Sequence, residues 1–171
     1  MGKKLFFALA MVGFMAFTAN AQRIAYVDIN EILESMKEYK SAQKELDDLA
    51  ARWRRQISEE YDKIKGLYNR YQAEQVLLSD EVRRQKEEEI TNKEKQVRQM
   101  QKDKFGPEGA LFKKRQELVR PIQERVYATI EEFANNKGYD FIFDKSGNAG
   151  MIYSNERHDK TDDIKKKLGI E

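Results

Sequence analysis

Apolar residues recur along this chain with two different periods, and the changes of period predict where strands and helices lie. The run RIAYVDI at 23–29 is short, apolar and rich in β-prone residues, which predicts a strand. Asp28 and Glu31 have the spacing of a capping box, so a helix is expected to begin there. From Glu31 to Leu78 the chain has no proline and one glycine, which predicts a single helix of about 45 residues.

Apolar side chains follow this helix at steps of three or four residues, which places them on one face. They are Ala42, Leu46, Leu49, Trp53, Ile57, Tyr61, Ile64, Tyr68 and Tyr71. The sequence LLSDEV at 77–82 then predicts a tip, because Ser79 can cap a new helix whose first turn carries Asp80 and Glu81. The chain is therefore expected to turn back and form a long antiparallel helical hairpin.

The returning arm carries fewer apolar residues and is interrupted by Gly106-Pro107. Pro107 is expected as the first residue of a restarted helix, which Pro121 is expected to kink and Gly138 to end. Because glycine widens the backbone freedom and proline removes an amide donor, we interpret Gly106 and Pro107 as a hinge at which the arm bends. The alternative is a junction with a fixed angle.

The C-terminal part contains two aromatic runs around a Ser-Gly-Asn turn, between Tyr139 and Tyr153. This pattern predicts a β-hairpin, which the returning arm brings beside the strand at 23–29. Residues 159–169 have acids first, lysines last and a terminal glycine, which predicts a short capped helix. The predicted fold is mainly α with a small β body, in which a helical-hairpin tentacle is carried on three strands per subunit.

A body of three strands has open edges and an apolar face that one short helix covers incompletely. Open edges are templates for pairing with further strands, so we expect the chain to self-associate through the body. The residues expected at that contact are Ile24, Tyr26, Val27, Phe141, Ile142, Phe143, Met151, Ile152 and Tyr153.

The N-terminus has the features of an export signal. Lys3 and Lys4 precede an uncharged apolar run that ends before Ala19-Asn20-Ala21, which predicts a signal peptide at 1–21, cleaved near Ala21. A membrane anchor is the alternative, but the run is short for one. The predicted domains of the mature chain are 22–43 as the first part of the body, 44–111 as the tentacle and 112–171 as the rest of the body.

Charge and composition narrow the class of function. The precursor has 32 basic and 30 acidic residues, so the loss of Lys3 and Lys4 leaves a mature chain of zero formal net charge. Nucleic acid is therefore not expected as a partner, because proteins that bind it are usually strongly basic. Cysteine is absent, and the sequence contains no recognisable phosphate loop, nucleophile–base set or metal-ligand cluster. We therefore expect neither an enzyme nor a bound cofactor or metal.

Candidate contact residues lie along the outgoing arm and at its tip. The apolar face of this arm is wider than the sparse face of the returning arm can cover, which leaves large side chains for contact with another protein. The candidates are Trp53, Ile57, Tyr61, Ile64, Tyr68, Tyr71, Val76, Leu77 and Leu78. The alternative is that they pack within or between arms and contact no other protein.

The order of these elements carries a family resemblance. A signal peptide, RIAYVDI, a long charged helical hairpin and the C-terminal YDFIFDKSGNAGMIYSNERHDKTDDIKKKL together resemble the Skp (OmpH-like) family of periplasmic chaperones over the whole mature chain. Membership implies a homotrimer with a β-rich body and three helical tentacles around a cavity. It also implies a periplasmic location and a holding function for unfolded outer-membrane β-barrel proteins, without ATP.

The resemblance also allows contact with lipopolysaccharide or a membrane surface. Arg83, Arg84 and Lys86 are the candidates for lipid-phosphate contact, but acidic residues are interleaved with them, as on an ordinary solvated helix face. A structural coiled-coil spacer of the cell envelope that binds no client explains the long arms equally well. Suppression of the aggregation of an unfolded β-barrel protein would distinguish these two functions.

Overall fold

The computed structural model describes residues 22–147 and 150–170, and the predicted signal peptide at 1–21 lies outside the described residues. The described chain divides into two units. We call residues 32–127 the arm, and residues 22–31 together with 128–170 the body. The two units are described separately below.

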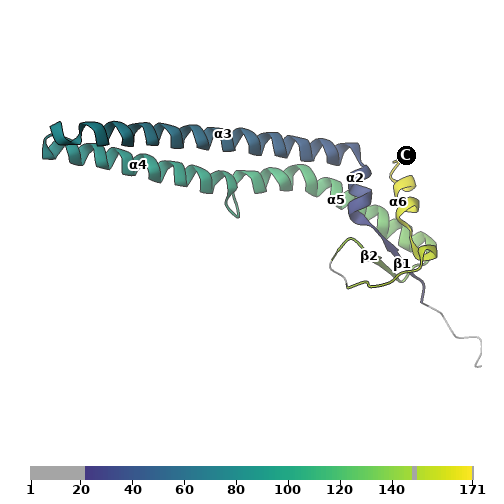
Figure 1. Ribbon diagram of the computed structural model, residues 1–171. Helices are drawn as coiled ribbons and strands as arrows, with labels where there is room; N and C mark the ends of the chain where they lie inside the picture. Colours follow the sequence, from purple (N-terminus) through teal and green to yellow (C-terminus); the bar gives the residue numbers. More distant parts are fainter. Residues whose placement is uncertain (1–21, 148–149, 171) are drawn as a thin grey trace, which may run out of the picture. The chain divides into compact units, whose positions relative to one another are not determined.

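The arm is an antiparallel helical hairpin (Figure 1). Its outgoing helix is α3 (Lys37–Glu74), a 3₁₀ turn η2 (Gln75–Leu77) forms the tip, and α4 (Asp80–Phe105) returns beside α3. The predicted cap is confirmed, because the side chain of Ser79 accepts a hydrogen bond from the backbone N–H of Val82 at 3.4 Å. The turn predicted at 77–82 therefore lies where the sequence placed it.

The outgoing helix is not continuous, and the prediction of one helix from Glu31 to Leu78 is wrong. A short helix α2 (Ile29–Ser35) ends before Met36, whose backbone is extended, and α3 starts at Lys37. Met36 N donates to Leu33 O at 3.0 Å, and the Met36 side chain is 1% exposed. Burial of this large apolar side chain compensates for the interrupted helical hydrogen bonds.

Two separate apolar clusters hold the arm helices together. The first consists of Ala42, Leu46 and Val119, with Tyr39, Leu111, Leu118 and Ile122 packed against them. The second consists of Ile57, Ile64 and Val97, with Ile90, Met100 and Phe105 packed against them. The four-residue loop at 106–109 lies between the return-helix residues of the two clusters.

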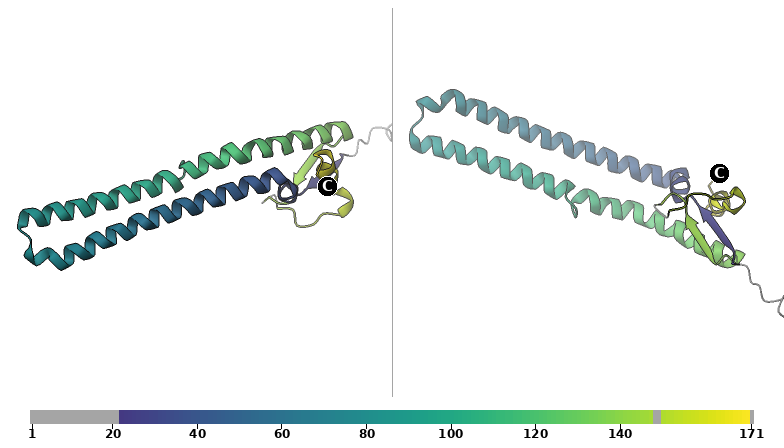
Figure 2. Two further views of the ribbon diagram at one scale, coloured as in Figure 1. Left: turned by 90° about the horizontal axis from the view of Figure 1, so that it is seen from above. Right: turned by 60° about the horizontal axis from the view of Figure 1, so that its bottom comes forward.

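This loop corrects the expectation for Pro107, which does not begin the next helix. Gly106 N donates to Lys102 O at 2.8 Å, Gly109 N donates to Gly106 O at 2.9 Å, and α5 (Ala110–Lys137) follows. Residues 106–109 thus form a β-turn with proline at its second position and glycine at its fourth, where these residues are favoured. Figure 2 shows the turn projecting from the return helix, with the first part of α5 resuming along the line of α4.

The body contains a parallel two-stranded sheet. Strand β1 (Ile24–Val27) pairs with β2 (Phe141–Asp144), with Ile24 opposite Phe141 and Val27 opposite Asp144. The predicted pairing between the N-terminal strand and the first aromatic run is therefore confirmed. On the other side of β1, Lys160 N donates to Tyr26 O at 2.9 Å, so β1 has backbone partners along both edges.

The helix ends in the body follow the sequence signals. Helix α5 runs through Pro121 and ends before Gly138, whose φ of 67° is in the left-handed region that favours glycine. Helix α6 (Thr161–Lys167) follows the 3₁₀ turn η3 (Glu156–His158). The predicted C-terminal helix is therefore confirmed.

The second strand of the predicted hairpin is not seen in the described single chain, whose sheet has two strands. Met151, Ile152 and Tyr153 are outside any strand, and Ile152 is 100% exposed. Residues 148–149 of the predicted turn lie outside the described residues. A two-stranded hairpin with its apolar side chains uncovered is only marginally stable in water, which is consistent with the missing strand.

Candidate binding surface

Three of the predicted contact residues are buried inside the arm. Ile57, Ile64 and Tyr71 are 7–8% exposed. The Tyr71 hydroxyl also donates a hydrogen bond to Glu87 Oε1 across the hairpin, and this bond raises the pKa of Tyr71. Ile57 and Ile64 belong to the second apolar cluster. These side chains hold the two helices together, as the packing interpretation expects.

Trp53 is half-buried and packs against a residue that sequence reasoning missed. Its ring meets the Phe105 ring edge to face, with 6.1 Å between centroids, and Lys104 Nζ lies 4.6 Å from the Trp53 centroid. Phe105 is the last residue of α4, directly before the turn at 106–109. Its position beside Gly106-Pro107 was the available signal, because a large aromatic residue at a helix end often packs against the neighbouring helix.

The remaining predicted residues present apolar surface to solvent. Tyr61 is 42% exposed and Tyr68 is 51% exposed on α3, and Val76 and Leu77 at the tip are 83% and 85% exposed. Leu78 is half-buried. We call Tyr61, Tyr68, Val76 and Leu77 the exposed apolar row. These four residues lie along the distal half of the outgoing helix and at the tip.

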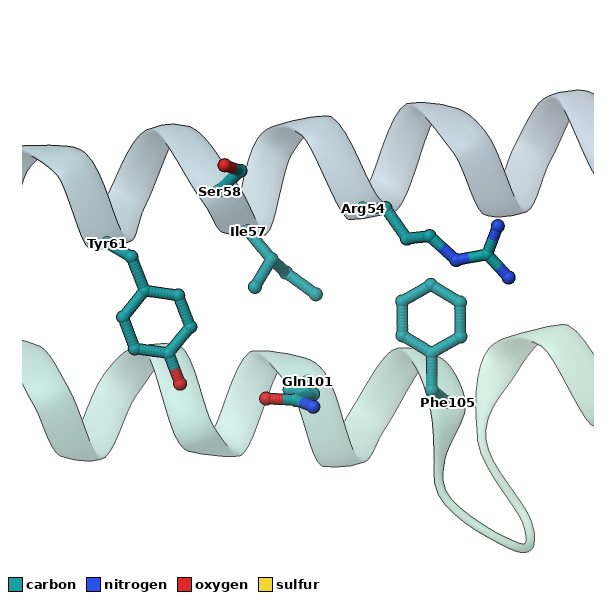
Figure 3. A pocket seen from close by; sticks show the side chains of 6 residues that line it. All are labelled: Arg54, Ile57, Ser58, Tyr61, Gln101 and Phe105. Atoms are coloured by element: carbon teal, nitrogen blue, oxygen red, sulfur yellow. The ribbon is translucent and has the colours of Figure 1, made fainter.

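A groove lies at one end of this row, where α3 faces α4 (Figure 3). It has a volume of about 380 Å³ and is lined by Arg54, Ile57, Ser58, Tyr61, Gln101 and Phe105. A second hollow of about 330 Å³ shares Gln101 and Phe105 and continues to Arg98, Lys102 and Gly106. In Figure 3 the rings of Tyr61 and Phe105 flank the Ile57 side chain, with Arg54 beside Phe105. The groove thus combines an apolar floor with cationic margins.

The three predicted lipid-phosphate contacts are already engaged by carboxylates. Arg83 lies 3.2 Å from Asp80, Arg84 lies 2.9 Å from Glu81, and Lys86 lies 4.0 Å from Glu74. A phosphate would have to compete with these acidic groups for each base. This pairing favours the solvated-face interpretation of the basic cluster.

The body has its own exposed apolar surface, made of residues predicted to mediate self-association. Ile24, Phe141 and Phe143 are 43–50% exposed, and the two phenylalanine rings stack with 6.3 Å between centroids. Tyr26 and Val27 are buried, Ile142 is half-buried, and Tyr153 is 83% exposed. The sheet therefore has apolar groups that its own chain leaves partly uncovered.

A partly buried polar junction around Thr161 links the C-terminal segment of the body to the residue that follows β1. Asp159 Oδ1 accepts hydrogen bonds from Thr161 N at 2.9 Å and Thr161 Oγ1 at 2.6 Å. Thr161 Oγ1 in turn accepts from Asp28 N at 2.9 Å, and Lys145 Nζ donates to Asp159 Oδ2 at 3.2 Å. Burial raises the pKa of Asp159, but the bonds from Thr161 and Lys145 outweigh it and hold that pKa below its usual value.

Neither a metal cluster nor a membrane span is found in the part of the chain that the structure describes. His158, the single histidine of the sequence, accepts a hydrogen bond from Arg157 at its Nε2. A long helical hairpin with exposed apolar side chains and a small α/β body together define a protein of the helical-arm class.

Comparison with known proteins identifies the family. The model of the outer membrane protein (OmpH-like) family matches residues 23–168, and the chain belongs to this family. OmpH-like proteins are periplasmic chaperones and are in general not enzymes. No curated protein matches the chain.

A solved structure from Caulobacter crescentus CB15, a candidate outer membrane chaperone (OmpH-like), shares the fold. Its TM-score with this chain is 0.69 at 10% sequence identity, and the match covers 86% of this chain and 83% of that chain. The resemblance seen in the sequence is thus confirmed. The OmpH-like fold is maintained here with few identical residues.

Proposed function

We propose that the mature chain is a periplasmic holding chaperone, which binds unfolded outer-membrane β-barrel proteins and prevents their aggregation without ATP. The observation that carries this proposal is the exposed apolar row. Tyr61 and Tyr68 on α3 and Val76 and Leu77 in the turn η2 are each at least 42% exposed, whereas Ile57, Ile64 and Tyr71 of α3 are buried in the hairpin. When an unfolded chain covers such a side chain, the apolar area removed from water contributes roughly 25 cal/mol per Å² to the binding free energy.

The arm keeps its shape without these four residues, which leaves them free for a client. The two apolar clusters and the contact between Tyr71 and Glu87 hold α3 against the return helices. Tyrosine and aliphatic groups in an adaptable surface suit clients of many sequences, because they need no fixed partner. If a client contacts several arms at once, the weak contacts together give a high overall affinity, while each single contact stays reversible.

We propose further that the chain acts as a homotrimer joined through the body. Ile24, Phe141 and Phe143 expose one apolar face, and the outer edge of β2 has no strand beside it in the described chain. Met151, Ile152 and Tyr153 are apolar and outside any strand. Their pairing in the assembled body would supply the third strand per subunit that the sequence predicts.

We also propose that the turn at Gly106 and Pro107 allows the return helix to bend. The last helical bond of α4 ends at Gly106 and the first bond of α5 starts at Gly109, so no helical hydrogen bond runs through the turn. Helix α3 is unbroken opposite it, which favours bending over detachment. Bending would change the width of a cavity between three arms.

The decisive experiment dilutes a urea-unfolded outer-membrane β-barrel protein into buffer with the mature chain, and measures light scattering and the mass of the complex. We expect suppressed scattering and a soluble complex. Replacing the four exposed residues by serine should abolish holding without changing the circular dichroism spectrum. The matched control replaces Phe112 and Tyr127, which are 45% and 53% exposed on α5, by serine.

The outcomes separate the candidate functions. Unchanged scattering with the unmodified chain would indicate the structural spacer. Equal loss of holding in the control would show that α5 contributes as much as the exposed apolar row. Contact with lipopolysaccharide is a weaker candidate, because the carboxylates of Asp80, Glu81 and Glu74 already occupy the predicted bases.

A further inference from the structure

The groove between Tyr61 and Phe105 has a chemical character that the rest of the exposed apolar row lacks. Ile57 forms its floor at 8% exposure, and Tyr61 and Phe105 supply aromatic walls. Arg54 lines the groove and Lys102 lines the adjoining hollow, which shares Gln101 and Phe105 with it, and both cations are exposed. The tip residues Val76 and Leu77, in contrast, lie on an open turn that lines neither hollow.

Arg54 and Lys102 have no carboxylate partner among the described residues, unlike several other bases on the arm. Within residues 22–147 and 150–170, neither Arg54 nor Lys102 lies within ion-pair distance of a carboxylate, whereas Arg98 lies 3.3 Å from Glu94. The acid next to Lys102 in sequence, Asp103, accepts a hydrogen bond from Gln99 at 2.7 Å. The groove and the adjoining hollow therefore offer one positive charge each, Arg54 and Lys102, with unused capacity for a negative partner.

The spacing of the groups indicates how a ligand would be arranged. The guanidinium carbon of Arg54 lies 5.8 Å from the centroid of Phe105. In an extended peptide, residues two positions apart point to the same side and are about 6.7 Å apart. Because Arg54 lies over the Phe105 ring, an aromatic side chain against Phe105 would thus place a carboxylate two residues away within reach of Arg54.

We propose that this groove is a recognition site for extended segments of unfolded protein in which an aromatic residue and an acidic residue are two positions apart. The apolar floor takes the aromatic side chain, and the unpaired cations take the carboxylate. The inference rests on the proposed holding function and adds a sequence preference to it. A chain with zero net charge can select acidic segments in this way, because the charge that matters is local.

The test measures binding of fluorescein-labelled ten-residue peptides to the mature protein by fluorescence anisotropy at low salt. One peptide carries a central Phe-Ser-Asp, and the comparison peptides carry Phe-Ser-Lys and Ala-Ser-Asp in the same background. We expect the first peptide to bind roughly tenfold more tightly than Phe-Ser-Lys, since each exposed charge pair contributes up to about fivefold. We expect a similar difference from Ala-Ser-Asp, which lacks the apolar area of the phenylalanine ring. Equal affinity for the three peptides, or no binding of any, would overturn the proposal.

Matched charge reversals assign the preference to the groove. In the double variant Arg54→Glu, Lys102→Glu, we expect the preference for Phe-Ser-Asp over Phe-Ser-Lys to vanish or invert. The control Lys93→Glu, Lys95→Glu changes the net charge equally at two exposed positions of α4 that line neither hollow. If the control loses the preference equally, the preference is a general effect of net charge, and its assignment to the groove is refuted.

The holding assay keeps the two proposals distinguishable. If the unmodified protein suppresses aggregation of an unfolded β-barrel but shows no peptide preference, the groove assignment fails and the chaperone function stands. If it suppresses no aggregation, the proposed function fails, whatever the peptides do. The groove proposal is upheld when the peptide preference is present and depends on Arg54 and Lys102.

Discussion

Thr161 is a buried polar residue at which separate segments of the body meet, so replacing its hydroxyl tests how the body is stabilised. Thr161 is 4% exposed, its Oγ1 donates to Asp159 at 2.6 Å, and it accepts from Asp28 N at 2.9 Å. Thr161→Val keeps the shape and removes both bonds. It leaves the Asp28 amide without its acceptor, so we expect the free energy of unfolding to fall by about 2–4 kcal/mol.

Chemical denaturation of the mature protein, followed by circular dichroism, measures this loss, and hydrogen exchange at the Asp28 amide locates it. Thr161→Ser is the matched control, because it keeps the hydroxyl and removes one methyl group, which costs about 1 kcal/mol. The reasoning is refuted if Thr161→Val unfolds like the unmodified protein. It is also refuted if Thr161→Ser is as destabilised as Thr161→Val.

The same junction predicts a dependence on pH. The pKa of Asp159 is lowered in the folded protein because the bonds from Thr161 and Lys145 outweigh the opposing effect of burial. A lowered pKa gives stability that is present above the unfolded pKa of about 3.9 and is lost as the pH falls through the folded pKa. We therefore expect the difference in unfolding free energy between the unmodified protein and Thr161→Val to shrink below about pH 4.

Three further predictions concern assembly, the tip and the turn. If the chain forms the proposed trimer, Phe141→Asp should dissociate it by placing an unpaired charge in the proposed body contact, and a mass measurement at micromolar concentration that still gives three chains would contradict this. Ser79→Ala removes the cap of α4 and should cost about 1 kcal/mol in denaturation experiments, with Ser79→Asn as a control that keeps a capping group. Deleting Gly106–Gly109 should join α4 to α5 and narrow the distribution of distances between spin labels at the arm tips. An unchanged distribution would contradict the proposed hinge.

The elements that the sequence predicted well are those set by local chemistry. Ser79 caps α4 because its hydroxyl reaches the Val82 amide, and Gly138 ends α5 because its φ of 67° favours glycine. The strand at RIAYVDI and its pairing with the first aromatic run followed from apolar content and from a chain that turns back. The caps and helix ends depend on residues a few positions apart, and the strand pairing depends only on a hairpin that returns the chain to its starting point.

The errors arise where a distant contact decides a local conformation. Met36 looks like an ordinary helix residue in sequence, and its burial, which the one-dimensional pattern does not show, accompanies the break between α2 and α3. Pro107 satisfies the rule for a first helical position but also the rule for a β-turn, and Gly109 favours the turn. Phe105 was overlooked as a site residue because its partners, Trp53 and Arg54, are about fifty positions away.

The parallel pairing of β1 with β2 has a consequence for the order of folding. Ile24 and Phe141 are neighbours in the sheet although most of the chain lies between them, and closing so long a loop directly is slow. The arm can form first from local contacts, and its ion pair between Glu38 and Arg125, at 3.0 Å, then shortens the loop that remains. Because β1 precedes the arm in the chain and β2 follows it, β1 can pair with β2 only after the whole arm has been made, and we expect a hairpin that has already closed to speed this pairing.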